Sequence, residues 1–121
     1  MKKRSYKITF DLKEGYSPTG RVHTLKFAGD VIKDWLTDRL EAGQLIVTGF
    51  LQDGLLFFPV GEKKITVNPS AVFAGELSSP EDMKRTNKEV KATLESLAKT
   101  LKEKLKQESV YIIYLDKNWC V

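Results

Sequence analysis

The sequence is poor in the side chains that carry out most enzyme chemistry. Its 121 residues include one cysteine, Cys120, and one histidine, His23, so it has no internal disulfide and no Cys/His cluster with metal-ligand spacing. It also has no glycine-rich phosphate loop and no G-x-S-x-G nucleophile motif. These absences predict a protein that is not an enzyme, with no catalytic residue, no cofactor and no metal site.

Long hydrophobic runs are missing as well. No apolar run approaches the roughly 18 residues that can span a bilayer, and the basic start MKKRSYKITF has a strand pattern where a signal peptide has its apolar segment. We therefore expect a cytoplasmic protein without membrane contact. The length predicts one domain, residues 1–121, with a core of its own.

Basic side chains are plentiful and unevenly placed. The net charge is +4. Residues 1–29 carry seven basic and two acidic side chains, residues 30–78 carry four and seven, and residues 79–108 carry eight and six. Basic ends around an acidic middle suit an anionic partner bound on one side. The alternative is a charge that serves only solubility, which is the commoner case at this size.

The first third of the chain predicts two strands and a short helix. Residues 6–12 and 22–27 alternate apolar and polar side chains, which predicts a long hairpin. His23 falls in phase with the apolar residues of the second strand, so we expect it to pack rather than to catalyse. The next segment has helical periodicity, with Asp30 as its expected N-cap and Gly43 closing its C-terminus.

Residues 44–76 predict several short strands. The Asp-Gly pair at 53–54 is typical of a two-residue hairpin turn, and Gly61 indicates a second turn. The Asn-Pro pair at 68–69 is expected to end a strand, and Pro59 favours an edge strand. Turn signals this close together favour a strongly curved sheet or a small barrel.

Two adjacent rings, Phe57 and Phe58, lie in this segment. Neighbouring residues of a strand point to opposite faces, so only one ring can enter a given core. The other ring is expected to lie under a helix or to stay open to a nucleobase.

The last part of the chain predicts one long helix and a strand. Ser79 is a natural N-cap, Pro80 suits the first helical position, and Asp82 completes a capping box. A helix from 80 to about 107 would be longer than the body of the domain is wide, so it would cross the body and protrude. Residues 110–115 are apolar on both faces and predict a strand that is covered on both sides.

Lysines of the long helix fall on one flank of its apolar stripe. A solvated helix usually mixes charges to gain i,i+4 pairs, so a segregated row suits the phosphates of a nucleic acid. The alternative is that these lysines only cover the edge of the apolar stripe. The residues of this lysine row are Lys84, Lys88, Lys91, Lys99, Lys102 and Lys106.

Two further features suit nucleic acid. Residues 1–4 predict a flexible basic arm, and the loop GYSPTGR offers an aromatic ring and a guanidinium, the pair of groups that holds single-stranded RNA. A tyrosine resting on the adjacent sheet is the commoner alternative for that ring. The candidate residues of these two features are Lys2, Lys3, Arg4, Tyr16 and Arg21.

The strand run QLIVTGFLQDGLLFFPVGEKKITV, set between a short and a long helix with VYIIYL returning last, resembles a PUA-like pseudo-barrel. The size and basic character also resemble the small PrgU-type regulatory proteins of Gram-positive conjugative plasmids. This resemblance implies an α+β fold with a strongly curved antiparallel or mixed sheet, one short helix and one long helix. It also implies RNA as the partner.

The leading hypothesis is a non-enzymatic RNA-binding regulatory protein. It would contact phosphates of RNA, or of another single-stranded nucleic acid, through the lysine row. The alternative is a protein-interaction module or homodimer that uses the long helix, because its apolar stripe is close to a heptad. The residues of that stripe are Val90, Leu94, Leu97 and Leu101.

Overall fold

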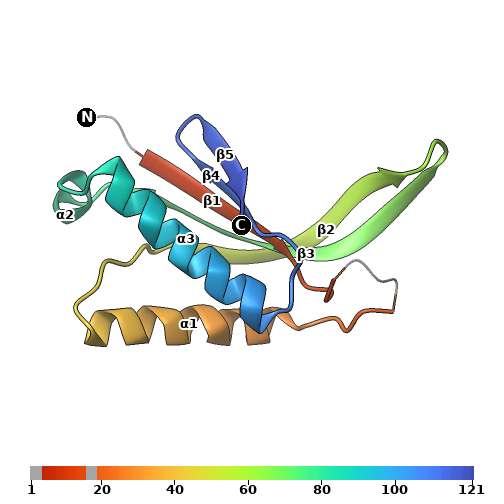
Figure 1. The fold of residues 1–121 in the computed structure, drawn as a ribbon, viewed down its shortest axis with the longest axis horizontal. Helices are drawn as coiled ribbons and strands as arrows, with labels where there is room; N and C mark the ends of the chain where they lie inside the picture. The colour runs from red at the N-terminus through yellow and green to blue at the C-terminus, as the bar shows by residue number, and fades with distance from the viewer. Residues whose placement is uncertain (1–3, 16–18) are drawn as a thin grey trace.

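The computed structural model describes residues 4–15 and 19–121 of the chain. These residues form a small α+β fold, in which a five-stranded antiparallel sheet has the order β2-β3-β1-β4-β5 (Figure 1). The elements are β1 (Arg4–Asp11), α1 (Leu25–Glu41), β2 (Phe50–Val60), β3 (Lys64–Leu77), α2 (Pro80–Met83), α3 (Asn87–Lys104), β4 (Tyr111–Tyr114) and β5 (Lys117–Cys120).

The core lies between one face of the sheet and helices α1 and α3 (Figure 1). On β1 the alternation predicted from the sequence is confirmed, because Ile8 and Phe10 are fully buried on the helix-facing side. The leucines of α3 face them and are equally buried. The opposite face of the sheet has no helix over it within the described residues. No described helix is long and apolar enough to cross a membrane.

The expected pseudo-barrel is wrong. Strands β2 and β5 each have one strand neighbour among the described residues, so the sheet keeps two open edges. The strands are also fewer and longer than the turn signals predict, since β2 has 11 residues and β3 has 14. The edge position inferred from Pro59 is confirmed, because this residue lies in β2.

Two turn predictions in the β2–β3 region fail for separate reasons. Strand β2 runs straight through the Asp-Gly pair at 53–54, and the chain turns at Gly61, which has the left-handed φ of 73°. Strand β3 continues through Pro69, whose carbonyl accepts a hydrogen bond from the Leu12 amide nitrogen (2.9 Å). The backbone N–H that a proline lacks would point toward β1, as its carbonyl does. The last β1–β3 pair is Asp11 with Ser70, so the β1–β3 ladder needs no hydrogen bond from an N–H at position 69.

The predicted second strand at 22–27 is also wrong. Only Val22 makes a β-bridge there, with Lys13, and helix α1 starts at Leu25. Thr24 caps that helix by accepting a hydrogen bond from the Phe27 amide, so Asp30 lies inside the helix instead of capping it. Because α1 starts at Leu25, it has 17 residues and is longer than the short helix that the sequence predicts.

Two details of this region follow the prediction. His23 is buried, and its ring stacks on that of Phe27 with 5.0 Å between the centroids. At the other end of α1, Gly43 has the left-handed φ of 68° that closes a helix.

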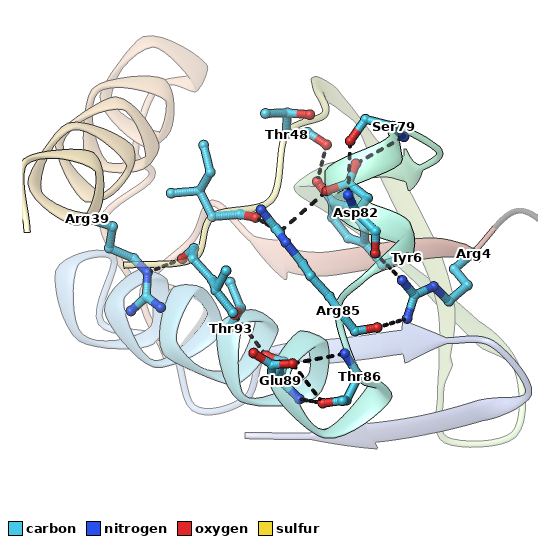
Figure 2. Close-up of polar contacts among 12 residues, drawn as sticks. Arg4, Tyr6, Arg39, Thr48, Ser79, Asp82, Arg85, Thr86, Glu89 and Thr93 are labelled. Carbon is cyan, nitrogen blue, oxygen red and sulfur yellow. Dashed lines mark hydrogen bonds and ion pairs between the residues drawn. The ribbon is translucent and has the colours of Figure 1, made fainter. Parts of the chain in front are cut away.

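The predicted long helix is broken into α2 and α3, because the segment holds two capping boxes. The first, at Ser79 and Asp82, matches the prediction. The second, at Thr86 and Glu89, starts a new helix two residues after Lys84 closes the first one (Figure 2). A capping box supplies partners for amides at a helix start, so it favours initiation at Thr86 over continuation.

The final strand is covered on one side only. Ile112 and Tyr114 are buried against the helices, whereas Tyr111 and Ile113 are 55% and 44% exposed. A short hairpin to β5, which the sequence analysis did not predict, follows this strand.

The second capping box makes part of the stability dependent on pH. The Thr86 backbone N–H donates to Glu89 Oε1 at 3.0 Å, and the Thr86 hydroxyl donates to the same oxygen at 3.1 Å. Both bonds favour the ionised carboxyl and hold the pKa of Glu89 below its usual range. The stabilisation is complete above the ordinary Glu pKa of about 4.3 and is lost as the pH falls through the lower pKa of the folded state.

We expect Glu89→Gln to reduce the free energy of unfolding at neutral pH, with a difference from wild type that shrinks as the pH falls below 4. Urea titrations followed by circular dichroism from pH 7 to pH 3 measure that difference. Glu62→Gln, in the β2–β3 turn, is the control and should not show this pattern. A difference that stays constant across the range would mean that the carboxylate does not cap α3.

Candidate functional site

A pocket opens on the uncovered face of the sheet, where the end of β1 meets the β2–β3 hairpin and the loop between α3 and β4. Its volume is about 260 Å³. Its lining combines aromatic rings with convergent polar side chains, which is the usual character of a small-molecule site. The lining residues are Thr9, Phe10, Asp11, Gly15, Leu56, Phe58, Asn68, Gln107, Glu108, Ser109 and Tyr111. We refer to it below as the candidate pocket.

A carboxylate is fixed on the floor of the candidate pocket. Asp11 and Ser70 are opposite each other in the β1–β3 register, and the Ser70 hydroxyl lies 3.0 Å from Asp11 Oδ1, to which it donates. Ser70 is buried, so its rotamer is restricted by the surrounding sheet. A charged group that is held in this way can act on a ligand without first being ordered, which lowers the cost of binding.

A buried glutamine joins the two sides of the pocket rim. Gln107 Nε2 donates to the carbonyl of Lys13 at 3.0 Å and to that of Leu105 at 3.1 Å. The Gly15 amide donates to the Lys106 carbonyl at 3.1 Å. These bonds tie the segment after β1 to the loop after α3, so the rim is built from parts of the chain more than 90 residues apart.

The candidate pocket is anionic and aromatic. Its charged lining side chains are Asp11 and Glu108, and among the described residues no lysine or arginine lines it. The rings of Phe58 and Tyr111 also line it, from β2 and β4. Carboxylates attract a cation by charge and aromatic faces attract it by their quadrupole. In a chain with net charge +4, this local sign favours a cationic ligand that carries a flat ring.

Other places in the described part of the molecule suit a site less well. A hollow of about 600 Å³ lies between α1 and α3, but its lining mixes acids with Arg39 and Lys104. Three of its polar side chains already contact one another, since Trp35 Nε1 donates to Ser96 Oγ at 3.1 Å and the Arg39 guanidinium donates to the same oxygen at 3.2 Å. No group of three His, Cys, Asp or Glu side chains within residues 4–15 and 19–121 could hold a metal ion.

The six lysines predicted to contact phosphates do not form one row on one helix. Lys84 is the C-cap of α2, and Lys106 follows α3 with a left-handed φ of 52°. The helical wheel through all six fails because the helix is interrupted between Lys84 and Thr86. The Nζ of Lys91 lies 5.5 Å from the centre of the Trp119 ring, which shields that charge in part. The lysines that lie on α3 are Lys88, Lys91, Lys99 and Lys102.

Arg4 is a structural residue. It is the first residue of β1, and its guanidinium donates to the carbonyls of Arg85 (2.8 Å) and Asp82 (Figure 2). The same guanidinium donates to Asn87 Oδ1 at 3.2 Å. It therefore holds the junction of α2 and α3 against the sheet. This set of bonds is incompatible with its predicted place in a flexible arm.

Of the remaining predicted contacts, the structure describes Arg21 alone. Arg21 is exposed beside the Lys13–Val22 bridge and does not line the candidate pocket. Lys2, Lys3 and Tyr16 lie outside the described residues.

Solved structures share the fold of this chain. No protein-family model and no curated protein matches the sequence. A phage SAM lyase in complex with S-methyl-5'-thioadenosine matches over 98% of this chain and 88% of its own, with a TM-score of 0.69 and 17% identity. The fold is that of a phage SAM lyase. The same kind of enzyme in its apo state matches with a TM-score of 0.68 and 17% identity, over 98% of this chain and 87% of that one.

This likeness corrects the functional predictions. The similar structures are those of an enzyme, and neither is a PUA-like domain. The resemblance to PUA-like and PrgU-type proteins is therefore wrong, and so are the predictions of a non-enzymatic protein and of an RNA-binding regulator. The alternative, a free helical interface, is not favoured either, because Leu94, Leu97 and Leu101 of α3 are fully buried in the core.

The sequence analysis missed the residues of the candidate pocket. The alternation of residues 6–12 places Asp11 on the polar face of its strand, but it does not reveal that the β2–β3 hairpin borders that face and makes a pocket there. The one available signal was Phe58, since its neighbour Phe57 had to point the other way. The structure places Phe58 in the pocket wall and leaves Phe57 63% exposed.

Proposed function

We propose that this chain is an enzyme that binds S-adenosylmethionine in the candidate pocket and cleaves a carbon–sulfur bond to release S-methyl-5'-thioadenosine. The observation that carries the proposal is the lining, which has two carboxylates, the aromatic residues Phe58 and Tyr111 on the uncovered face of the sheet and, among the described residues, no basic side chain. The shared fold with phage SAM lyase over 98% of the chain supports it.

The chemistry of the ligand suits this lining. S-adenosylmethionine combines a flat adenine with a sulfonium cation, so the rings of Phe58 and Tyr111 can stack on the base or face the sulfur. Asp11 and Glu108 supply the opposite charge. The volume of about 260 Å³ is just below the range of about 300–1,000 Å³ for drug-sized ligands. The candidate pocket therefore suits one part of the molecule, with the rest in its open mouth.

The reaction needs few chemical groups from the protein. When the bond between sulfur and the amino-acid chain breaks, sulfur keeps the electron pair and becomes a neutral thioether. The four-carbon fragment must then lose a proton to a base or be captured by its own carboxylate, and neither route adds water. The protein has to bind the sulfonium, hold the fragment in a reactive conformation and keep water away. A chain with no metal site among its described residues and a single histidine is sufficient for that work.

We expect purified protein that is incubated with S-adenosylmethionine to produce S-methyl-5'-thioadenosine well above a heat-denatured control, as measured by liquid chromatography and mass spectrometry. The same run identifies the four-carbon product, which is an unsaturated amino acid after proton loss or a lactone after internal capture. If neither binding by calorimetry nor product formation is observed, the proposal is wrong.

Phe58→Ala tests whether this pocket is the site of reaction. Loss of one stacking ring is expected to lower kcat/KM about 10-fold, since a base–aromatic contact contributes about 1–3 kcal/mol. Leu40→Ala is the matched control, because Leu40 is an exposed apolar residue of α1 outside the pocket. Equal activity of both variants would mean that the reaction takes place elsewhere on the protein.

A further inference from the structure

A second hollow, of about 330 Å³, lies beside the candidate pocket on the uncovered face of the sheet. The two spaces share Thr9 and Leu56 as lining residues, so one leads into the other. We call the second space the side hollow. The volume of the candidate pocket suits only part of S-adenosylmethionine, so the remainder of that molecule needs a neighbouring space of this kind.

The polar side chains of β1 run along the floor of both spaces. Lys7, Thr9 and Asp11 alternate with the buried Ile8 and Phe10, so all three point to the uncovered face. Asp11 lines the candidate pocket, Lys7 lines the side hollow, and Thr9 lines both. One strand therefore presents an anionic group in the first space and a cationic group in the second.

Lys7 has no ion-pair partner among the described residues. It is exposed, and the register places it between Ala74 of β3 and Ile113 of β4, which carry no charge. The other charged residue at the side hollow is Asp53. Its register partner, Ala71, is buried on the helix-facing side, so the pleat directs the Asp53 side chain away from the uncovered face. The side hollow is therefore cationic.

The spacing of these two charges matches that of the charges on S-adenosylmethionine. In an extended amino-acid chain the carboxylate lies about 5 Å from the sulfonium sulfur, and a lysine side chain reaches about 6 Å from its Cα. The Cα atoms of Lys7 and Asp11, four residues apart on one strand, are about 13 Å apart at about 3.3 Å per residue. A ligand with its sulfonium beside Asp11 can therefore place its carboxylate within reach of the Lys7 ammonium.

We propose that the side hollow binds the amino-acid end of S-adenosylmethionine and that Lys7 pairs with its carboxylate. Gln52 of β2 lies in one row with Val72 and Thr9 on the same face, and it offers an amide oxygen to the α-ammonium group. The inference rests on the proposed function. It makes Lys7 a specificity residue, which favours S-adenosylmethionine over related nucleosides that lack the carboxylate.

The test is calorimetry on Lys7→Gln with three ligands. The variant should bind S-adenosylmethionine about 10-fold more weakly than wild type, because a hydrogen bond between two charged groups is lost. It should lose no affinity for S-methyl-5'-thioadenosine or for decarboxylated S-adenosylmethionine, neither of which has the carboxylate. Lys7→Arg keeps the charge and should bind all three ligands like wild type. Lys33→Gln is the control, since Lys33 is an exposed lysine of α1 outside both spaces.

The outcomes separate this inference from the proposed function. A wild type that binds none of the three ligands overturns both. A wild type that binds S-adenosylmethionine no more tightly than Lys7→Gln does overturns the role of Lys7 alone, and so does equal weakening for all three ligands. If Lys7→Gln fails to fold, wild type itself provides the measurement. It should bind decarboxylated S-adenosylmethionine about 10-fold more weakly than S-adenosylmethionine, and equal affinities would overturn the inference.

Discussion

Asp11→Asn is expected to weaken the affinity for S-adenosylmethionine about 30- to 100-fold and that for S-methyl-5'-thioadenosine less than about 3-fold. The two ligands differ at sulfur, which is a cation in the first and a neutral thioether in the second. A carboxylate about 4 Å from a unit positive charge contributes up to about 4 kcal/mol at an effective dielectric constant of 20. Part of that is lost to solvent at the open mouth of the pocket.

Asparagine is the appropriate replacement because it keeps the shape of the side chain. Its amide oxygen can still accept the hydrogen bond from Ser70, so the floor of the pocket is preserved while the charge is removed. Asp34→Asn, on α1, removes a charge outside the pocket and should change neither affinity. Calorimetry with both ligands measures the two ratios.

The outcome separates binding from a general loss of structure. If the affinities for both ligands fall equally, Asp11 shapes the pocket but does not face the sulfonium. If neither changes, the ligand does not bind next to Asp11. Turnover adds a second readout, since a carboxylate that only attracts the cation raises KM. One that takes a proton from the four-carbon fragment also lowers kcat, by about 10²–10⁴-fold.

The parts of the fold that the sequence predicted are those controlled by local patterns. Alternation along β1 and helical periodicity in α1 and α3 each depend on residues close in sequence, and all three elements are present. The Ser79 cap and the turn at Gly61 were equally local and correct. Such signals need no knowledge of the neighbouring elements.

The errors arose where tertiary pairing overrides a local preference. The Asp-Gly pair at 53–54 and Pro69 are turn signals in isolation, but β2 and β3 pair along 11 positions and absorb both. The break before α3 was visible in the sequence as a Thr86–Glu89 capping box. It was overlooked because uninterrupted helix formers suggested one element.

The candidate pocket could not be predicted in this way. Asp11, Ser70 and Gln107 belong to β1, β3 and the loop after α3, and they meet only because of the strand order and register. The spacing of these residues in the sequence does not predict that they lie close together. The lysine row, in contrast, was a clear pattern in the sequence. The break between α2 and α3 divides it, and none of its lysines lines the candidate pocket.

Leu97→Ala is expected to lower the free energy of unfolding by about 2–5 kcal/mol, the cost of removing a fully buried leucine side chain and leaving a cavity. Leu97 is 0% exposed on α3, packed in the core between the helices and the sheet. Since small domains are stable by only about 5–15 kcal/mol, this is a large share. Leu40→Ala, at a site 62% exposed, should cost less than about 0.5 kcal/mol.

Urea unfolding of the two variants decides what the α3 stripe does. A heptad-like spacing is the same whether a helix packs on its own sheet or on another chain, so the sequence alone gives no preference between these cases. Burial in the protomer predicts a loss that does not depend on protein concentration. A loss that grows on dilution, or one as small as that of Leu40→Ala, would return the stripe to the surface and contradict the core described above.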